Sequence, residues 1–251
     1  MLTMGFWPFL FREILTFTRS RVDLWLTIIP PVLTAFFFMG SMSKVVGNIN
    51  GTSYVNFVVP GIALMSAAGF IQSMSTRMFN EGFGQSLKEY FSMPAYRSSY
   101  VLAKLLAMLA LSTLYALAFL WAVGIFFGMY VNISSMLRVI AALLLSNAAV
   151  AALFILVALL IQDMGSFLVT ANVLGQLLIW GSTVFYPLNA IPRYLQPLAM
   201  INPVTYGAEL LRCVLLHNQF CVPQMVYLSI LAVTLGIVAT ALLSRRAAKV
   251  L

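Results

Sequence analysis

Long apolar stretches recur along the whole of this 251-residue chain, and their length limits what the chain can fold into. A helix needs about 20 apolar residues to cross a hydrocarbon core of roughly 30 Å. Apolar residues make up 62% of the chain and charged residues only 8%, far below the roughly 25% of a soluble domain. We therefore predict an all-α membrane protein with six transmembrane helices, at 24–42, 54–75, 99–128, 136–161, 166–185 and 223–243.

The positions of lysine and arginine predict the orientation of these helices. An even number of spans puts both termini on one side, and cytoplasmic loops carry an excess of Lys and Arg. With cytoplasmic termini, ten basic residues lie inside and four outside. The inner set is Arg12, Arg19, Arg21, Arg77, Lys88, Arg97, Lys104, Arg245, Arg246 and Lys249, and the outer set is Lys44, Arg138, Arg193 and Arg212. Lys104 lies just inside the third span, and we expect its side chain to reach the cytoplasmic surface.

The net charge of +8 does not indicate a nucleic-acid partner. A nucleic-acid-binding protein gathers its basic residues on one soluble face, whereas here they fall between apolar runs. Membrane lipids are the expected surroundings. The N-terminal segment 1–21 fits this view, because it combines Trp7, Leu10, Phe11 and Ile14 on one helical face with Arg12, Thr16 and Arg19 on another. We predict an interfacial helix there, which either binds a partner or simply anchors the first span.

The long cytoplasmic loop contains a second amphipathic segment. Gly84 and Pro94 bracket a short predicted helix at 84–94, on which Leu87, Tyr90 and Phe91 share a face while Lys88 and Glu89 are polar. An aromatic face directed into the cytosol must bury against something. The two alternatives are a separate protein and the chain's own spans.

Four prolines divide the segment that precedes the last span. Pro187, Pro192, Pro197 and Pro203 break residues 186–213 into pieces too short to span and too apolar to lie free in water. We predict short re-entrant helices at the outer surface, because broken backbone at membrane depth must be surrounded by protein or line a water-filled cavity.

Polar residues at helical spacing mark the fifth span. Asn172, Gln176, Trp180 and Thr183 fall at i, i+4, i+8 and i+11, and Gln72 is a similar residue in the second span. Polar side chains in transmembrane helices face the bundle interior or a cavity. They either line a substrate path or hydrogen-bond neighbouring helices, and the sequence favours neither.

The remaining polar residues predict no catalytic or metal site. His217 is the only histidine, which excludes a His-Glu-x-x-His metalloprotease, and we place it in a solvent-facing loop. Asp163 is expected in a short cytoplasmic turn, and Glu209 and Arg212 are spaced to pair along one helical turn. Cys213 and Cys221 fit either a disulfide or two thiols packed separately.

Three blocks of residues, in order, carry a family resemblance: Phe57-Val-Val-Pro-Gly61, the loop from Gly84 to Pro94, and Phe185-Tyr186-Pro187 followed by Asn202-Pro203 and Tyr206. Together with six spans and a basic N-terminal helix, they resemble the type-2 ABC exporter permeases over nearly the whole chain. The resemblance implies a multi-pass protein of the cell inner membrane that exports its substrate. Members of that family work as two permeases with two ATP-binding subunits, and we expect a homodimer.

The resemblance further implies that residues 84–94 are a coupling helix seated in the ATP-binding subunit. The expected contacts to that partner are Glu81, Gln85, Leu87, Lys88, Glu89, Tyr90 and Phe91. This sequence has no Gly-x-x-x-x-Gly-Lys-Ser/Thr loop, so ATP and magnesium are expected in the partner and no enzyme activity in this chain. The substrate path is expected along the first, second and fifth spans, with Gln72, Asn172, Gln176, Trp180 and Thr183 as its polar lining.

Two alternatives come from other functional classes. An ion-coupled secondary transporter would show internal repeats and ionisable groups at mid-membrane depth, and the sequence shows neither clearly. A non-transporting membrane assembly protein would share the fold and lack coupled ATP hydrolysis. The substrate class stays open among drugs, lipids and lipid-linked glycans, although the apolar composition favours a hydrophobic or lipid-linked molecule.

Overall fold

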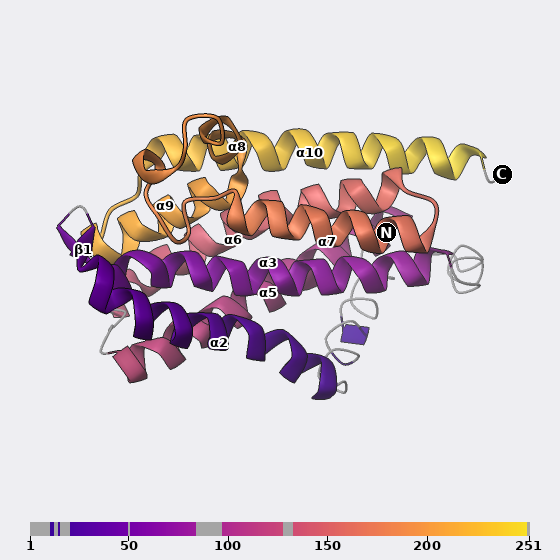
Figure 1. Ribbon diagram of the computed structural model, residues 1–251. Coiled ribbons are helices and arrows are strands. Elements are labelled where there is room, and N and C mark those ends of the chain that lie inside the picture. The colour runs from indigo at the N-terminus through magenta and orange to yellow at the C-terminus, as the bar shows by residue number, and fades with distance from the viewer. Residues whose placement is uncertain are drawn as a thin grey trace.

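The computed structural model describes residues 11, 12, 15, 21–49, 51–83, 97–127 and 133–249. The long helices of the described residues run together as one bundle (Figure 1). They are α2 (Arg21–Val46), α3 (Tyr54–Phe83), α5 (Arg97–Phe127), α6 (Ile133–Leu160), α7 (Met164–Trp180) and α10 (Val222–Lys249). The shorter elements are the antiparallel strands β1 (Asn48–Ile49) and β2 (Thr52–Ser53), the 3₁₀ turn η1 (Leu188–Ala190), α8 (Gln196–Ile201) and α9 (Pro203–His217).

Five of the long helices are long and apolar enough to cross a membrane, and α7 is shorter, with 17 residues. The prediction of a continuous span at 166–185 is therefore wrong at its end. The helix stops at Trp180, where the Gly181 amide donates to Leu177 O, and residues 181–186 follow without regular structure. The carbonyls of Thr183 and Val184 accept hydrogen bonds from Arg212, which lies outside α7. Tertiary hydrogen bonds thus replace the last helical turn that the apolar pattern suggested.

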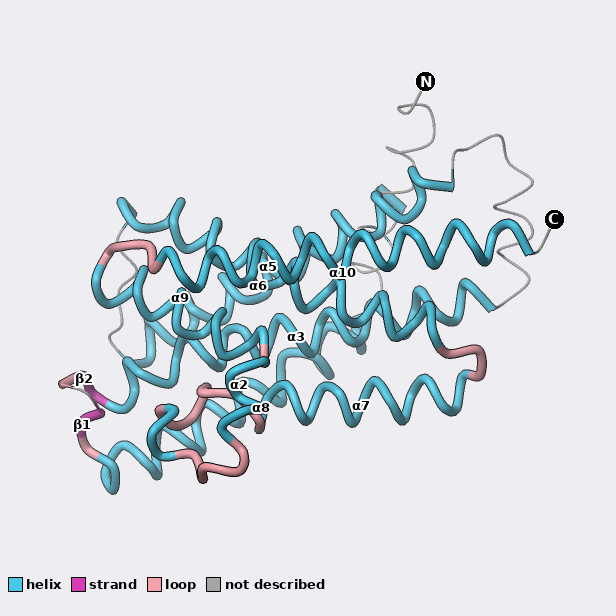
Figure 2. The backbone as a smooth tube through the Cα atoms, turned by 90° about the horizontal axis from the view of Figure 1, so that it is seen from above, coloured by secondary structure: helices cyan, strands magenta, loops and turns pink. Residues whose placement is uncertain are grey.

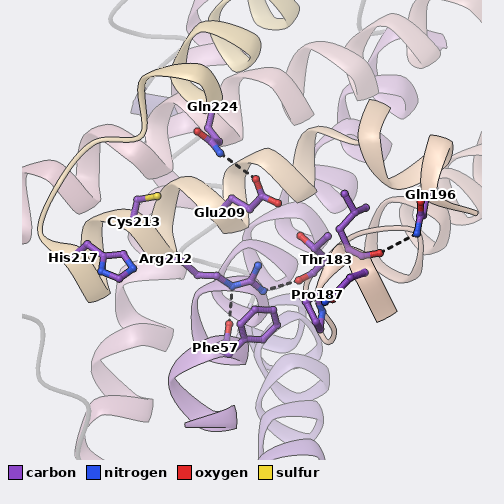
Figure 3. A pocket seen from close by; sticks show the side chains of 11 residues that line it. Phe57, Thr183, Pro187, Gln196, Glu209, Arg212, Cys213, His217 and Gln224 are labelled. Carbon is purple, nitrogen blue, oxygen red and sulfur yellow. Dashed lines mark hydrogen bonds between the residues drawn. The ribbon is translucent and has the colours of Figure 1, made fainter. Parts of the chain in front are cut away.

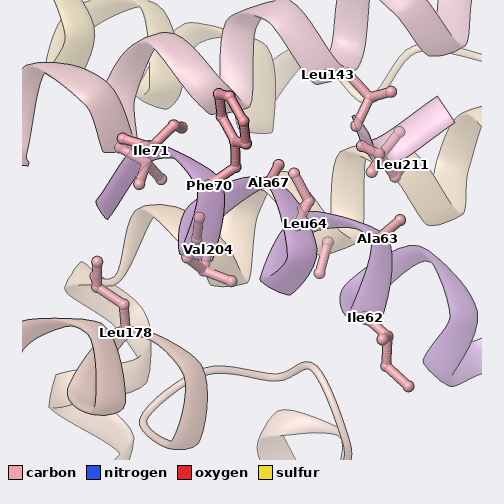
Figure 4. Packing of buried hydrophobic residues seen from close by; sticks show 14 of the residues in the cluster. Ile62, Ala63, Leu64, Ala67, Phe70, Ile71, Leu143, Leu178, Val204 and Leu211 are labelled. Atoms are coloured by element: carbon pink, nitrogen blue, oxygen red, sulfur yellow. The ribbon is translucent and has the colours of Figure 1, made fainter. Parts of the chain in front are cut away.

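Helix α3 is the centre of the bundle and packs against α2, α5, α6, α7 and α9. In an 18-residue window of its apolar stretch Tyr54–Asn80, 78% of the residues are buried. Figure 4 shows its residues Ala63, Ala67 and Phe70 among side chains of α6, α7 and α9. Lipid tails are as apolar as leucine, so close packing, favoured by small residues, holds such helices together. The alanines along α3 provide these close approaches.

The short elements gather at one end of the bundle. The β1–β2 hairpin, α8 and α9 lie at that end, and the turn between α6 and α7 lies at the other (Figures 1 and 2). Asn202 starts α9: its side chain accepts from the Val204 amide at 2.9 Å and donates to Leu178 O at 2.9 Å. Pro203 follows at the first helical position, where proline is favoured. Pro203 therefore starts a 15-residue helix, which is longer than the segments between the preceding prolines.

A disulfide joins the end of α9 to the start of α10. Cys213 and Cys221 are bonded, with Cα atoms 6.0 Å apart, which decides between the two alternatives left open by the sequence. Asn218 provides the turn between the helices, in the left-handed conformation that asparagine tolerates, with φ of 56°.

Lys104 does not extend to the surface as its position suggested. Its side chain lies inside the bundle and is only 2% exposed. It starts from the α5 face that also carries the buried residues Ala103, Ala107 and Met108, so the helix turns Lys104 toward its neighbours. Proximity to a helix end is thus insufficient for snorkelling when the residue lies on the packed face.

Candidate functional site

The polar side chains of the second and fifth predicted spans meet between α3 and α7. Gln72 Nε2 on α3 donates to Asn172 Oδ1 on α7 at 2.8 Å. Gly175, one turn further along α7, makes this approach possible, because a Cβ atom there would lie 2.5 Å from Gln72 Oε1. Gln72 and Asn172 therefore join two helices by a hydrogen bond, as one of the two sequence-based alternatives proposed.

The same stripe continues toward the end of α7. Trp180 Nε1 donates to Gln176 Oε1 at 2.8 Å, along the helix surface. Asn172, Gln176 and Trp180 are all exposed on this single chain, Trp180 by 48%. The polar groups thus face out of the bundle, where a second chain, a substrate or lipid would contact them.

Thr183 does not belong to this stripe. It lies beyond the end of α7 and is 1% exposed, and its amide donates to Thr205 Oγ1 at 3.3 Å. The helical spacing that placed it below Trp180 ends at Gly181, because the chain leaves the helix there. The structure therefore brings together Gln72, Asn172, Gln176 and Trp180 and separates Thr183 from them.

The face around the stripe is otherwise apolar. On α7 the exposed apolar residues are Leu168, Val169, Val173 and Leu177. Helix α2, which packs on α3 and among the described residues meets α7 only near Trp180, is even less covered: only 17% of its apolar stretch Ile29–Val46 is buried. Aromatic rings connect the two helices, since Phe38 of α2 stacks on Phe185 at 4.5 Å, and Phe185 stacks on Trp180 at 5.3 Å. Helices α2 and α7 together present a broad apolar face with a narrow polar stripe, which we call the α2–α7 face.

The predicted coupling residues Gln85, Leu87, Lys88, Glu89, Tyr90 and Phe91 lie outside the described residues, as does most of segment 1–21. Glu81 is in the last turn of α3, and only its backbone is described. The helices on either side of the loop are described, and α3 ends at Phe83 while α5 begins at Arg97. The end of α3 at Phe83 lies at the end of the bundle opposite to α8 and α9.

Asp163 lies in the short turn between α6 and α7, as expected, and it caps α7. Its carboxylate accepts from the Ser166 amide at 2.7 Å. Hydrogen bonds from Ser166 hold the pKa of the Asp163 carboxyl below its ordinary value. An N-cap contact of this kind accounts for the residue structurally.

Arg212 has an environment that the sequence did not predict. It is 8% exposed, its Nε donates to Phe57 O at 2.9 Å, and its Nη2 donates to Thr183 O at 2.6 Å and Val184 O at 3.1 Å. The guanidinium also lies 3.7 Å from the Phe57 ring centroid. Arg212 thus fixes α9 to α3 and to the segment after α7.

The direct ion pair that the spacing of Glu209 and Arg212 allows is not formed among the described residues, although the two charges still interact electrostatically. Glu209 accepts from Gln224 Nε2 of α10 at 3.1 Å, while Arg212 is held by the three carbonyls. A guanidinium has five donors and can bind several carbonyls at once. The rule that residues three positions apart pair on a helix does not take such carbonyls into account. The only clue in the sequence is an arginine among Leu210, Leu211 and Val214, on an otherwise buried helix face.

The residues described form no metal site, since no three of their His, Cys, Asp or Glu side chains gather as ligands. Five apolar helices long enough to span a bilayer, a shorter apolar helix beside them and a broad exposed apolar face define a multi-pass membrane protein. The ABC-2 type transporter family matches residues 5–216, and the chain belongs to this family.

Relatives of known name agree with this assignment. The chain is 28% identical over 207 residues to the inner membrane transport permease YadH of Escherichia coli K12, covering 78% of this chain and 76% of the relative. It is 24% identical over 230 residues to the transport permease ycf38 of Cyanophora paradoxa, covering 90% of this chain and 79% of the relative. The type-2 ABC permease resemblance of the sequence is thereby confirmed, and the chain is a membrane transport permease.

Proposed function

We propose that this chain is the membrane subunit of an ATP-driven exporter, which moves a hydrophobic or lipid-linked molecule outward across an inner membrane. A separate ATP-binding subunit supplies the hydrolysis and holds ATP and magnesium. Two permease chains and two ATP-binding subunits form the working complex. The family assignment supports the transporter class, and the α2–α7 face supports the dimer and the path.

The α2–α7 face is the observation that carries this proposal. Asn172 and Gln176 lie on the exposed side of α7, and polar side chains in membrane helices usually face a neighbouring chain or a water-filled cavity. The apolar part of this face would contact a second permease chain, and the amide side chains of the stripe would contact the transported substrate. A substrate with long apolar groups would find few charges to desolvate there.

The proposed arrangement has six spans and cytoplasmic termini. With 17 residues, α7 is about 26 Å long, at the lower limit for crossing a hydrocarbon core of roughly 30 Å. The irregular segment 181–186 and the re-entrant elements η1, α8 and α9 complete the outer side in this proposal. The disulfide supports the same orientation, because disulfides persist in oxidising compartments outside the cytosol.

Crosslinking tests the dimer and the path. The structure pairs both native cysteines, so a single new cysteine reports a contact between two chains. Val173→Cys places a thiol on the α2–α7 face, where Val173 is 53% exposed. Ile230→Cys on α10, where the residue is 59% exposed, is the matched control. We expect oxidation of membranes to crosslink the V173C chains and not the I230C chains; equal crosslinking of both would contradict the proposal.

Coupled ATP hydrolysis tests the transporter class. The permease is co-purified with its candidate ATP-binding subunit, and ATPase and substrate movement are measured in proteoliposomes. Replacing both Leu87 and Tyr90 by Asp should leave the permease inserted, because both are predicted to lie outside the spans, while hydrolysis no longer drives transport. Normal transport by this double variant would show that residues 84–94 are not the coupling helix.

A further inference from the structure

A cavity with a mixed polar and apolar lining lies at the α8–α9 end of the bundle. Its volume is about 670 Å³, within the range of about 300–1,000 Å³ typical of small-molecule sites. Residues of α3, the segment after α7, α9 and the start of α10 line it (Figure 3). His217 and Asn189 are exposed members of the lining, and Thr183 and Arg212 are buried ones.

The cavity contains buried polar atoms that the protein does not satisfy. Among the residues described, Thr183 Oγ1 and Gln224 Oε1 are buried without a hydrogen-bond partner, and both residues line the cavity. A buried polar group without a partner costs about 1–3 kcal/mol, so such groups are retained where something else binds them. Two of them in one cavity indicate that its natural state includes a bound molecule or ordered water.

Two opposite charges distinguish this cavity from a simple hydrated one. Arg212 uses Nε and Nη2 for the carbonyls of Phe57, Thr183 and Val184, and no acceptor among the described residues binds its Nη1. Glu209 accepts from Gln224 through Oε2, which leaves Oε1 for another donor. Figure 3 shows Glu209 between Gln224 and Arg212. Glu209 and Arg212 interact electrostatically but make no direct hydrogen bond to each other among the described residues, so each retains bonding capacity toward the cavity.

We propose that this cavity binds a zwitterionic head group that carries a primary ammonium and an oxyanion. The ammonium donates to Glu209 Oε1, and the oxyanion accepts from Arg212 Nη1 and from the Thr183 hydroxyl. Phosphoethanolamine has this chemistry, both as a free molecule and as the head group of a membrane lipid.

Binding is measured on the purified full-length permease, without nucleotide or an ATP-binding subunit, so the result does not depend on the proposed export function. The probes are dihexanoyl phosphatidylethanolamine and free phosphoethanolamine, each with native mass spectrometry and isothermal titration. Dihexanoyl phosphatidylglycerol lacks the ammonium, and dihexanoyl phosphatidylcholine has an ammonium without N–H groups. We expect both ethanolamine probes, or the ethanolamine lipid alone, to bind at least about tenfold more tightly than the phosphatidylglycerol and phosphatidylcholine probes. This factor corresponds to the loss of one charge-assisted hydrogen bond.

Three variants decide whether this binding occurs in the cavity. Glu209→Gln should weaken binding of the ethanolamine probes about tenfold or more, and Asp163→Asn, which removes a carboxylate at the opposite end, should leave it unchanged. Asn189→Trp fills the cavity from an exposed position and should abolish binding without disturbing a buried contact.

Binding of the free compound as tightly as the lipid would assign a soluble ligand, and binding of the lipid alone would assign a bilayer lipid. Equal binding of all probes, no binding, or unchanged binding by both E209Q and N189W would overturn the proposal.

Discussion

The closest approach between the central helix and the segment after α7 yields the sharpest prediction, the effect of Gly61→Ala. A Cβ atom at Gly61 would lie 2.8 Å from Val184 Cγ1 and 2.9 Å from Val184 Cα. Carbon atoms in contact are separated by about 3.5–4.0 Å, so the two segments must move apart by roughly 0.6–1 Å. The Val184 backbone is part of the clash, and a rotamer change cannot relieve it.

The movement also affects Arg212, whose hydrogen bonds to Thr183 O and Val184 O are 2.6 Å and 3.1 Å long. Overpacking costs about 1–3 kcal/mol and weakening a hydrogen bond from a charged donor adds about 1 kcal/mol, while the helix preference of alanine over glycine offsets about 1 kcal/mol, so we expect a net loss of about 1–3 kcal/mol. At about 2–4 °C per kcal/mol for a chain of this size, the midpoint of thermal unfolding should fall by about 2–12 °C. Fluorescence-detected thermal unfolding in detergent measures this midpoint.

Gly69→Ala in the same helix is the matched control. Nothing lies within 4 Å of a Cβ atom at Gly69, and alanine favours a helix over glycine by about 1 kcal/mol. Its midpoint should therefore be equal to or above that of the original protein. If G61A and G69A unfold at the same temperature, the close contact with Val184 does not exist and the reasoning fails.

Three further predictions concern other contacts. Cys213→Ser together with Cys221→Ser should lower the unfolding temperature, and the unaltered protein should bind a thiol reagent only after reduction. Gln72→Leu should destabilise by about 1 kcal/mol through loss of the hydrogen bond to Asn172, and Asn172→Leu should have no further effect in the Gln72→Leu background. The pKa of Asp163 is lower in the folded protein, so its contribution to stability is present above the ordinary value of 3.8 and is lost as the pH falls through the folded pKa. The stability difference between the protein and its Asp163→Ala variant should therefore disappear in acid.

The sequence predicted most of the bundle because a single physical requirement, a length of about 20 apolar residues, dominates a membrane helix. The starts of α3 and α10, at Tyr54 and Val222, agree with the predictions of 54 and 223. The end of α7 was missed because apolar residues continue through Val184 and Phe185, while the helix ends by tertiary contacts with α9. The apolar pattern depends only on the residues of one segment. It cannot show that Arg212, far away in the sequence, binds the carbonyls of Thr183 and Val184.

The polar residues show the same division. The stripe of Asn172, Gln176 and Trp180 was predicted from spacing, since three residues on one helix need only the helical repeat to align. The contact of Asn172 with Gln72 spans a hundred residues of sequence and was predicted only as a general possibility. Lys104, Glu209 and Arg212 were misplaced, because the direction of a long charged side chain depends on which face of its helix is covered.

The unbroken length of α3 has a mechanical consequence for the proposed exporter. Its 30 residues make a rod of about 45 Å, which is held by Arg212 near one end and leads directly into residues 84–94 at the other. Five neighbouring helices bear on it. A tilt of about 10° would displace one tip by roughly 8 Å relative to the other. In the proposed orientation, a push on residues 84–94 would therefore reach the opposite leaflet through a helix whose only proline is Pro60.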